Sequence, residues 1–430
     1  MPVRQAFIGI DVGTSGIRAC AIDARGSELT SADTPLPAPE RDGTCVAQDP
    51  AIWWQVLCDT LDKLAVSLRG TQVMRIALDG TSSTLLLCQP DGTPLGPALM
   101  YNDARAIQAA EQVSAVAPKN SAARGASASL AKYLHLREQL HTPRAADAIP
   151  MHQADWLTGK LIGQFRYSDE NNALKLGYDP LARNWPGWLE QLGIDTATLP
   201  EVVAPGTPVG ALSDTCVKRW GWSDAILVAG TTDSTAGFLA TGATQTGTGV
   251  TSLGSTLVIK VLSDQPVFDA AHGIYSHRLG NHWLAGGASN AGGAILKQYF
   301  SNCDIHRYSR LLNPDQPTGL DYYPLPAPGE RFPVADPTLP PRLTPRPSSD
   351  RAFFQGILEG LASIETEGYR LLQACGAPSP TRVLSVGGGA QNKHWETLRA
   401  KRLGTPVLRA LHSEAAYGVA RLAVGIKDLF

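Results

Sequence analysis

The chain has 430 residues, of which 43% are hydrophobic and 18% charged, and its net charge is −2. This length exceeds what one hydrophobic core usually serves, so two or three domains are expected. The near-neutral charge excludes the basic surface that nucleic acid or an anionic membrane would need. No apolar run is long enough for a membrane span and no signal-peptide core is found, so we expect a cytoplasmic protein. The scattered cysteines show no metal spacing, which favours reduced, buried thiols.

Near the start of the chain, residues 7–23 show two β-prone runs joined by a tight turn, with Asp11 at its mouth. Gly13, Thr14 and Ser15 lie in this turn, where backbone N–H groups and a hydroxyl can meet an anion. An aspartate beside such an anion suits a magnesium ion that keeps most of its waters. An ordinary buried hairpin with Asp11 as a turn residue explains the same pattern equally well.

The next segments alternate between strand-like and helix-like patterns. Residues 53–68 carry apolar side chains at helical spacing after an Asp-Pro start signal, and a second helix is expected over residues 153–161. Residues 74–78 and 84–88 are expected to be neighbouring strands around the polar segment Asp79–Ser83. This alternation predicts an α/β architecture.

A Pro- and Gly-rich stretch at residues 199–210 precedes a fresh strand at residues 225–229, and we expect a domain boundary near residue 226. This strand delivers Asp233 to a Gly/Thr turn before an Ala-rich helix. Asp233 could simply cap that helix. In the other interpretation it is a general base that accepts a proton from an alcohol attacking a phosphorus atom.

The second half of the chain contains further glycine-rich turns. Residues 251–259 form a second candidate strand–turn–strand element, with hydroxyls at the turn. Residues 383–392 are a candidate buried strand running into three glycines, and a helix from about 394 to 402 follows, whose start favours a phosphate. Any one such glycine run is more often only a turn. The Pro-rich stretch at 314–347 contains interleaved aromatic residues, so we expect it to be packed rather than disordered.

Three common nucleotide-binding patterns are absent from the sequence. Gly159-Lys160 lacks the upstream glycine spacing of a P-loop. No His-Arg-Asp catalytic loop of a protein kinase occurs. Gly247-Thr248-Gly249 lacks both the third glycine and the distal acid of the dinucleotide fingerprint.

Taken in order, these segments resemble the FGGY family of carbohydrate kinases. Asp11–Arg18 is similar to the family's first phosphate hairpin, and Ser252–Thr256 to its second. Tyr101–Arg105 resembles its W-x-D-x-R sugar segment, with Tyr in place of Trp. Gly387–Asn392 resembles its adenosine loop. The resemblance covers nearly everything from residue 7 to about residue 425.

Further segments carry the same resemblance, with some departures. Gly230–Asp233 is similar to the family's catalytic-base motif, which is usually richer in glycine, and Gly329–Pro333 to its G-E-R-x-P loop. Ser129–His135 resembles a family signature but ends in His where Trp is usual. The chain is also shorter than most members, which suggests trimmed insertions.

The resemblance implies a two-domain α/β fold of the actin, hexokinase and Hsp70 type (ribonuclease H-like), with a cleft between the domains. It implies an N-terminal domain over residues 1–226 and a nucleotide-side domain over residues 227–430. A C-terminal helix at about residues 413–430 is expected to pack back on the first domain. The implied ligands are ATP, Mg²⁺ and a small sugar, with no nucleic acid or membrane partner, for a monomer or homodimer.

The resemblance also assigns roles to single residues. Asp233 and Asp11 are the expected catalytic residues: Asp233 would deprotonate the terminal hydroxyl of the sugar for in-line attack, and Asp11 would hold the hydrated Mg²⁺. The expected sugar-binding residues are Asp11, Asp79, Ser82, Ser83, Asp103, Arg105 and Asp233. The expected nucleotide-binding residues are Gly13, Thr14, Ser15, Gly254, Ser255, Gly293, Gly388, Gly389 and Asn392.

The segment Asp79–Ser83 bears on the substrate. It resembles the D-x-T-C-S segment of ribulokinase-type members, whereas xylulokinases usually carry Met-His-Gly there. Its small polar groups suit hydrogen bonds to a polyol, although Asp79 could instead cap the strand turn. We therefore expect D-ribulose, converted to D-ribulose 5-phosphate, with D-xylulose or another ketose or polyol as the alternative. A nucleotide-switching ATPase or binding module of the actin and Hsp70 type is an alternative of a different class.

Overall fold

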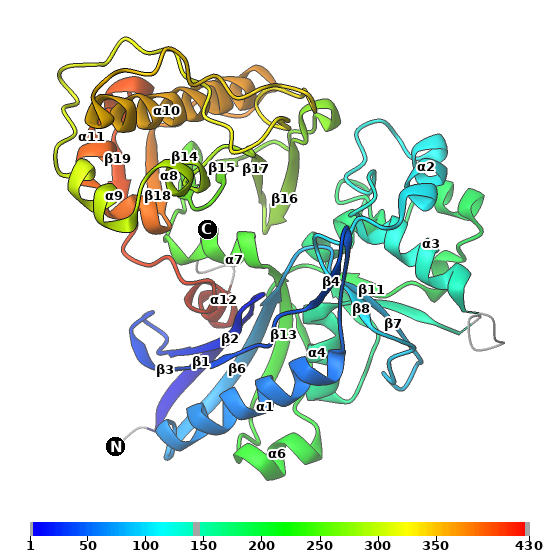
Figure 1. Ribbon diagram of the computed structural model, residues 1–430. Coiled ribbons are helices and arrows are strands. Elements are labelled where there is room, and N and C mark those ends of the chain that lie inside the picture. The colour runs from blue at the N-terminus through cyan, green and yellow to red at the C-terminus, as the bar shows by residue number, and fades with distance from the viewer. Residues whose placement is uncertain (1–2, 141–146, 426–430) are drawn as a thin grey trace. The chain divides into compact units, whose positions relative to one another are not determined.

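The computed structural model describes residues 3–140 and 147–425 and divides the chain into two compact units. Figure 1 shows the elements of both. The first unit consists of the described residues of Met1–Ala240, His277–Gly280 and Glu414–Phe430, and the second of Thr241–Ser276 and Asn281–Ser413. The predicted two-domain α/β architecture is therefore confirmed.

The first unit is built on a six-stranded sheet with the strand order β12-β13-β6-β1-β2-β3, beside a five-stranded sheet, β4-β5-β8-β7-β9, and the pair β10-β11. Its strands are β1 (Arg4–Val12), β2 (Gly16–Ile22), β3 (Glu28–Pro35), β4 (Glu40–Asp42), β5 (Cys45–Gln48), β6 (Thr71–Gly80), β7 (Leu85–Cys88), β8 (Ala98–Leu99), β9 (Ile149–His152), β10 (Tyr167–Asp169), β11 (Glu201–Val203), β12 (Pro208–Ala211) and β13 (Ile226–Thr232). Its α-helices are α1 (Pro50–Ser67), α2 (Ile107–Val116), α3 (Ser129–Gln139), α4 (Gln153–Ile162), α5 (Glu170–Ala173), α6 (Asp214–Trp220), α7 (Asp233–Ala240) and α12 (Ala415–Val424).

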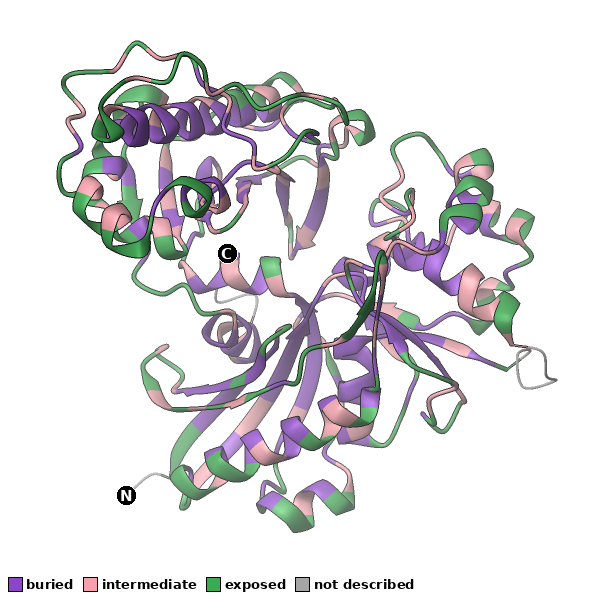
Figure 2. Ribbon diagram, in the orientation of Figure 1, coloured by how far each residue is buried: buried purple, intermediate pink, exposed green. Residues whose placement is uncertain are grey.

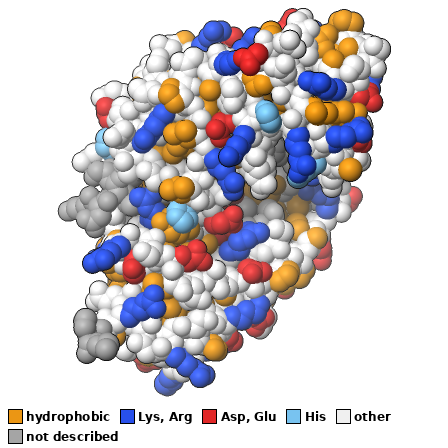
Figure 3. Space-filling model, turned by 90° about the vertical axis from the view of Figure 1, so that its left-hand side faces the viewer, with side chains coloured by type: hydrophobic (Ala, Val, Ile, Leu, Met, Phe, Trp, Pro, Cys, Tyr) orange, Lys and Arg blue, Asp and Glu red, His pale blue; other side chains and the backbone are white. Residues whose placement is uncertain are grey.

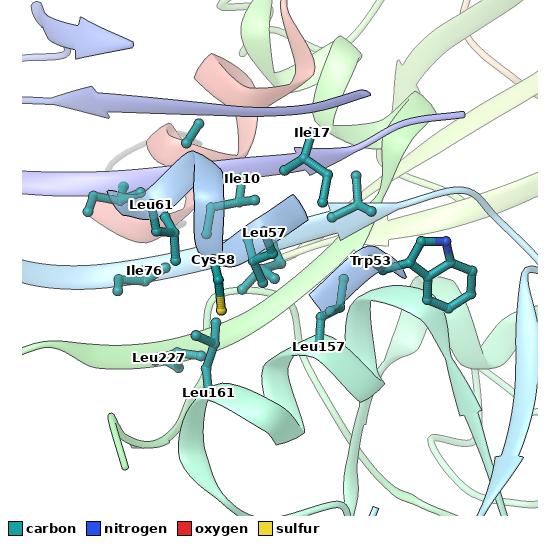
Figure 4. Packing of buried hydrophobic residues seen from close by; sticks show 14 of the residues in the cluster. Ile10, Ile17, Trp53, Leu57, Cys58, Leu61, Ile76, Leu157, Leu161 and Leu227 are labelled. Atoms are coloured by element: carbon teal, nitrogen blue, oxygen red, sulfur yellow. The ribbon is translucent and has the colours of Figure 1, made fainter. Parts of the chain in front are cut away.

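Helix α1 covers one face of the six-stranded sheet. The side chain of Asp49 caps its start by accepting a hydrogen bond from the Ala51 N–H, and Pro50 occupies the first turn, where it costs no hydrogen bond. Figure 4 shows the core that results, with side chains from α1, the sheet and α4 in one cluster: Ile10, Ile17, Trp53, Leu57, Cys58, Leu61, Ile76, Leu157, Leu161 and Leu227. Successive residues of a strand point to opposite faces, so Ile8 and Ile10 of β1 face α1 while Asp11 points to the other side.

Helix α12 packs against β1 and α7 through glycines. A Cβ atom on Gly9 of β1 would lie 2.1 Å from the carbonyl oxygen of Ala416, and one on Gly418 would lie 1.8 Å from the carbonyl oxygen of Ala236. Only hydrogen atoms fit at these crossings, so the helix backbones approach very closely. The C-terminal helix therefore belongs to the first unit, beside the strand that carries Asp11 and the helix that begins at Asp233.

Because α12 and α7 pack so closely, we expect a substitution at their contact to have a large effect on stability. Gly418→Ala places a methyl group inside the α7 backbone, so we expect the free energy of unfolding to fall by about 3 kcal/mol or more. Gly237→Ala is the matched control, because a Cβ on this glycine of α7 meets nothing within 4 Å and alanine favours helix. Urea unfolding of the two variants measures the difference, and equal stabilities would show that the crossing is loosely packed.

The second unit contains one six-stranded sheet, β16-β17-β15-β14-β18-β19, and its long helix α10 carries a row of buried residues, as Figure 2 shows. The strands of this sheet are β14 (Thr248–Leu253), β15 (Leu257–Ser263), β16 (Tyr275–Leu279), β17 (His282–Ala288), β18 (Arg382–Val386) and β19 (Val407–Arg409); of β16, only Tyr275 and Ser276 are counted in the second unit. Its α-helices are α8 (Ala294–Tyr299), α9 (Asn302–Ser309), α10 (Asp350–Ala374) and α11 (Lys393–Leu403).

The structure corrects three sequence-based expectations. Strand β13, expected to open the second domain, pairs in parallel with β6, so the main segment of the first unit ends at Ala240 rather than near residue 226. Strands β6 and β7 are not neighbours, because they belong to different sheets. All seven cysteines are free, as expected, but Cys303 is exposed rather than buried.

The Pro-rich stretch is packed, as expected: Tyr322, Leu325 and Phe332 are buried in the second unit. On the face in Figure 3, acidic and basic side chains are interspersed, so that face shows no large area of one charge sign. Among the described residues, no helix combines the length and the apolar character needed to cross a membrane.

Candidate active site

Three carboxyl groups come together at one edge of the first sheet. Strand β6 pairs in parallel with β1 and with β13, and in this register Asp79 lies opposite both Asp11 and Thr231. Asp233 follows β13 directly, as the first residue of α7. The carboxyl ends of three parallel strands therefore meet at this edge, which is where ligands bind in open α/β sheets.

Asp11 is nearly buried and has a cationic partner. Nη1 of Arg18, on the neighbouring strand β2, donates to Oδ2 of Asp11 over 3.3 Å. Burial raises the pKa of Asp11, against the opposing effects of its hydrogen bond with Asp79 and of the charge of Arg18. A bound cation at this edge would reverse that shift and keep Asp11 ionised.

Asp79 lies wholly inside the first unit, with no exposed surface. Neither of its oxygens receives an N–H or O–H from a described residue other than its acidic neighbours. Burial and then the charges of Asp11 and Asp233 raise the pKa of Asp79 well above its ordinary value. A raised pKa favours the protonated form of Asp79, and a protonated Asp79 can donate a hydrogen bond to the neighbouring Asp11. The geometry thus supports a role through Asp11, and the direct sugar contact of Asp79 stays a prediction.

Asp233 is partly exposed and stands at the start of α7. Its Oδ1 accepts a hydrogen bond of 2.6 Å from the Ser234 N–H, so it does contact the first turn of the helix. Inside the same turn, the hydroxyls of Thr232 and Thr235 are 3.0 Å apart and hydrogen-bonded. The helix-capping interpretation of Asp233 and the general-base interpretation are therefore compatible, because a carboxylate fixed by a backbone N–H still accepts a proton.

The turn between β1 and β2 lines a cavity of about 370 Å³ in the first unit. The turn is closed by a hydrogen bond from the Gly13 N–H to the carbonyl of Gly16, which leaves Thr14 and Ser15 exposed. The cavity is lined by Thr14, Ser15, Leu36, Ala38, Pro39, Arg41, Met100, Tyr101 and Asn102. The structure thus places the predicted phosphate hairpin beside the start of the predicted sugar segment.

Within the predicted sugar segment, Asp103 orients Arg105. Asp103 is fully buried, and its Oδ2 accepts a hydrogen bond of 2.6 Å from the Val46 N–H. The guanidinium of Arg105 is bonded to the same carboxylate, with Nε 2.9 Å and Nη2 2.7 Å from Oδ2. Arg105 keeps part of its side chain exposed, so the pair can present a fixed cation while Asp103 itself remains inside.

The loop after Asp79 is hydrogen-bonded to Gln153, a residue that the sequence did not assign to the site. Gln153, at the start of α4, accepts hydrogen bonds from the N–H of Thr81 at 3.1 Å and from its hydroxyl at 3.0 Å. Its Nε2 and the hydroxyl of Ser83 are buried without a partner among the described residues, whereas Ser82 is partly exposed. Ser83 also has a φ of 70°, which is uncommon for a non-glycine residue and occurs at functional turns. The available sequence signal for Gln153 was its place as a polar residue at the first position of a largely apolar helix.

In the second unit, the predicted nucleotide-binding residues also lie together. The Gly293 N–H donates to the carbonyl of Gly254 over 2.8 Å, so the start of α8 rests on the β14–β15 turn that contains Ser255. A Cβ on Gly389 would lie 2.8 Å from the Leu253 Cβ, directly before that turn. Gly388 opens the same short 3₁₀ helix as Gly389.

This glycine loop leads into α11. Asn392 caps the helix, because its Oδ1 accepts a hydrogen bond from the Trp395 N–H over 3.1 Å. Gly387 has a φ of 82°, a conformation that glycine adopts without strain. The second hairpin, the start of α8 and the glycine loop therefore form one continuous surface region of the second unit.

The residues fit a hydrated magnesium ion. The described residues contain no group of three or more His, Cys, Asp or Glu side chains placed to hold a metal. Mg²⁺ commonly keeps several waters and binds through one or two carboxylates together with substrate phosphates. Asp11, a carboxylate beside the glycine- and hydroxyl-rich turn, supplies that kind of donor.

The fold and these residues together indicate the class: a two-domain α/β phosphotransferase, with acids at the carboxyl ends of parallel strands and glycine-rich turns in both units. Residues 6–240 match the N-terminal domain of the FGGY family of carbohydrate kinases, and residues 249–425 match its C-terminal domain. The chain belongs to the FGGY family of carbohydrate kinases and is an ATP-dependent sugar kinase.

Similar proteins carry related names. The xylulose kinase of Escherichia coli (strain K12) is 25% identical over 438 residues, covering 97% of this chain and 89% of that protein. The xylulose kinase of Streptomyces rubiginosus is 28% identical over 464 residues, covering 97% of this chain and 87% of that protein. The crystal structure of a ligand-bound xylulose kinase from Lactobacillus acidophilus has a TM-score of 0.87 at 18% identity, covering 99% of this chain and 90% of that one. This structural similarity supports the assignment of the fold.

Proposed function

We propose that the protein phosphorylates the terminal hydroxyl of a ketopentose with ATP, and that D-xylulose is its first-ranked substrate. The carrying observation is the convergence of Asp11, Asp79 and Asp233 at one sheet edge of a chain whose similar proteins are named xylulose kinases. Those names favour D-xylulose over D-ribulose, which the sequence analysis had placed first.

In this proposal, each unit contributes one part of the reaction. Asp233 accepts the proton of the attacking hydroxyl, while Arg105, oriented by Asp103, binds sugar oxygens. Asp11 would hold a hydrated Mg²⁺, which would neutralise charge on the phosphates. In the second unit, the Gly254–Ser255 turn and the loop from Gly388 to Asn392 bind the nucleotide. Catalysis is then mainly positioning and charge stabilisation.

D-ribulose is the second candidate, because one local feature favours it. Asp79, Thr81 and Ser83 stand where xylulokinases usually carry Met-His-Gly, and this loop contains an unpartnered buried hydroxyl. A site built from such groups discriminates between sugars by their hydroxyl pattern, since an unmatched buried polar group is costly.

The test is ADP release measured with D-xylulose, D-ribulose, L-ribulose, glycerol and no sugar. We expect strong stimulation by a ketopentose, with kcat/KM highest for D-xylulose. A higher kcat/KM for D-ribulose would reverse this ranking and support the substrate that the loop Asp79–Ser83 favours. The same slow ADP release with every sugar would reject the kinase proposal and favour a nucleotide-switching ATPase.

A further inference from the structure

Lys132 is a buried cation that the proposed reaction does not use. It lies on α3 with no exposed surface. Its Nζ donates to the carbonyl of Ser83 over 2.8 Å and to the carbonyl of Met100 over 2.7 Å. Burying an ammonium group is expensive unless it is hydrogen-bonded, so these two carbonyls are the compensation that the structure provides.

The two carbonyls belong to the two segments with the candidate sugar-binding residues. Ser83 ends the loop that begins at Asp79, and its φ of 70° turns the backbone sharply at that point. Met100 directly precedes the segment 101–105 and lines the cavity beside the phosphate hairpin. The carbonyl of Met100 also accepts the Asp103 N–H over 2.9 Å, so Lys132 holds the turn that sets the place of Asp103.

We propose that Lys132 is a positioning residue for the sugar: its ammonium group bridges the loop 79–83 and the segment 100–105 and fixes the distance between them. This inference rests on the proposed function, because it takes those segments as the sugar site. Each hydrogen bond from a charged donor to a carbonyl contributes enough to change an equilibrium roughly tenfold or more. Losing both should loosen the two segments together.

The electrostatic surroundings make this bridge sensitive to pH. Burial lowers the pKa of Lys132 to about 7, against the raising effect of Asp103, and the charges of Lys175 and Arg105 lower it further. Of the packed elements, β7 carries only leucines and Cys88, and the one acid of α2, Glu111, is exposed. The ammonium is charged below pH 7 and loses its proton as the pH rises through that value, which weakens the bridge.

The test compares Lys132→Met, which removes the donors, with Lys132→Arg, which keeps them and does not titrate. Lys63→Met is the control, because Lys63 also donates to a backbone carbonyl, that of Asp33, but is exposed. For Lys132→Met we expect the KM for the ketopentose to rise roughly tenfold or more, with the KM for ATP within about twofold of wild type. The sugar KM of Lys132→Arg should lie between those of wild type and Lys132→Met. The sugar KM of Lys63→Met should equal that of wild type.

The pH profile and hydrogen exchange separate this role from a general loss of folding. In wild type, kcat/KM for the sugar should decline above about pH 7, and Lys132→Arg should not show this decline. The amides of Thr84 and Asp103, both hydrogen-bonded in the wild type, should exchange faster in Lys132→Met, while those of β14 do not change. A wild-type sugar KM and unchanged exchange in Lys132→Met would overturn the inference. Absence of sugar-stimulated activity in wild type would instead reject the proposed function. Hydrogen exchange alone would then test whether Lys132 bridges the two segments.

Discussion

Asp233→Asn is expected to lower kcat for sugar phosphorylation by about a thousandfold while leaving the binding of ATP nearly unchanged. Asparagine has the same shape and also caps helices, so it keeps the contact with the Ser234 N–H that the structure shows. It cannot accept the proton of the hydroxyl. Steady-state kinetics with the preferred sugar, together with calorimetric titration of ATP, measure both effects.

Two further variants decide between the roles of Asp233. Asp233→Ala removes both the proposed base and the acceptor of the Ser234 N–H, so we expect the same loss of kcat with an additional loss of stability of about 1 kcal/mol. Asp224→Ala is the matched control, because this aspartate of the first unit is exposed and its side chain accepts a hydrogen bond from the side chain of Gln72. Near-normal turnover in Asp233→Asn would show that Asp233 is a helix cap and that another group is the base.

The elements that the sequence predicted well are those encoded by local patterns. The helix expected over residues 153–161 is α4, Gln153–Ile162, because its apolar spacing and the glycine after its end are local signals. The hairpin at residues 7–23 is β1 and β2, paired in antiparallel register, with Asp11 at the end of the strand. The order of the motifs along the chain indicated the FGGY family, and the match over both domains confirms this.

The rest depended on contacts between distant segments. Strands β6 and β7 are joined by a short loop, yet they belong to different sheets, and only the pairing of β7 with β8 and β9 decides this. Gln153 and Lys132 look like ordinary surface residues in the sequence, because burial of a polar side chain is set by what packs around it. The raised pKa of Asp79 likewise follows from its burial and from the register that places it beside Asp11.

The second unit contains a buried ion pair next to the strands that lead into its two predicted nucleotide-binding turns. Arg399 of α11 donates to both oxygens of Glu365 on α10 over 2.6 Å, and both side chains are 1% exposed. Nη1 of Arg399 also donates to the hydroxyl of Ser385 on β18, and Glu365 accepts from the hydroxyl of Thr251 on β14. The pair therefore contacts both strands that lead into the glycine turns.

Removing one partner of this pair should be strongly destabilising, because the other charge stays buried without compensation. We expect Arg399→Met to lower the free energy of unfolding of the second unit by about 3–5 kcal/mol, measured by urea unfolding. The double variant Arg399→Met/Glu365→Leu should recover much of that loss, since two apolar side chains replace two charges. The surface pair of Arg370 and Glu367 is the control, and Arg370→Met should change stability by about 1 kcal/mol or less.

The KM for ATP of the same variants tests whether the ion pair positions the predicted nucleotide-binding turns. If the ion pair fixes the spacing of the two turns, the double variant should regain stability yet keep a raised KM for ATP. Ser385 loses Arg399 in both variants, and Thr251 loses Glu365 in the double variant. The KM for the sugar should stay at the wild-type value, since its proposed residues lie in the first unit. A double variant with both wild-type stability and a wild-type KM for ATP would mean that the pair stabilises the fold without positioning the nucleotide turns.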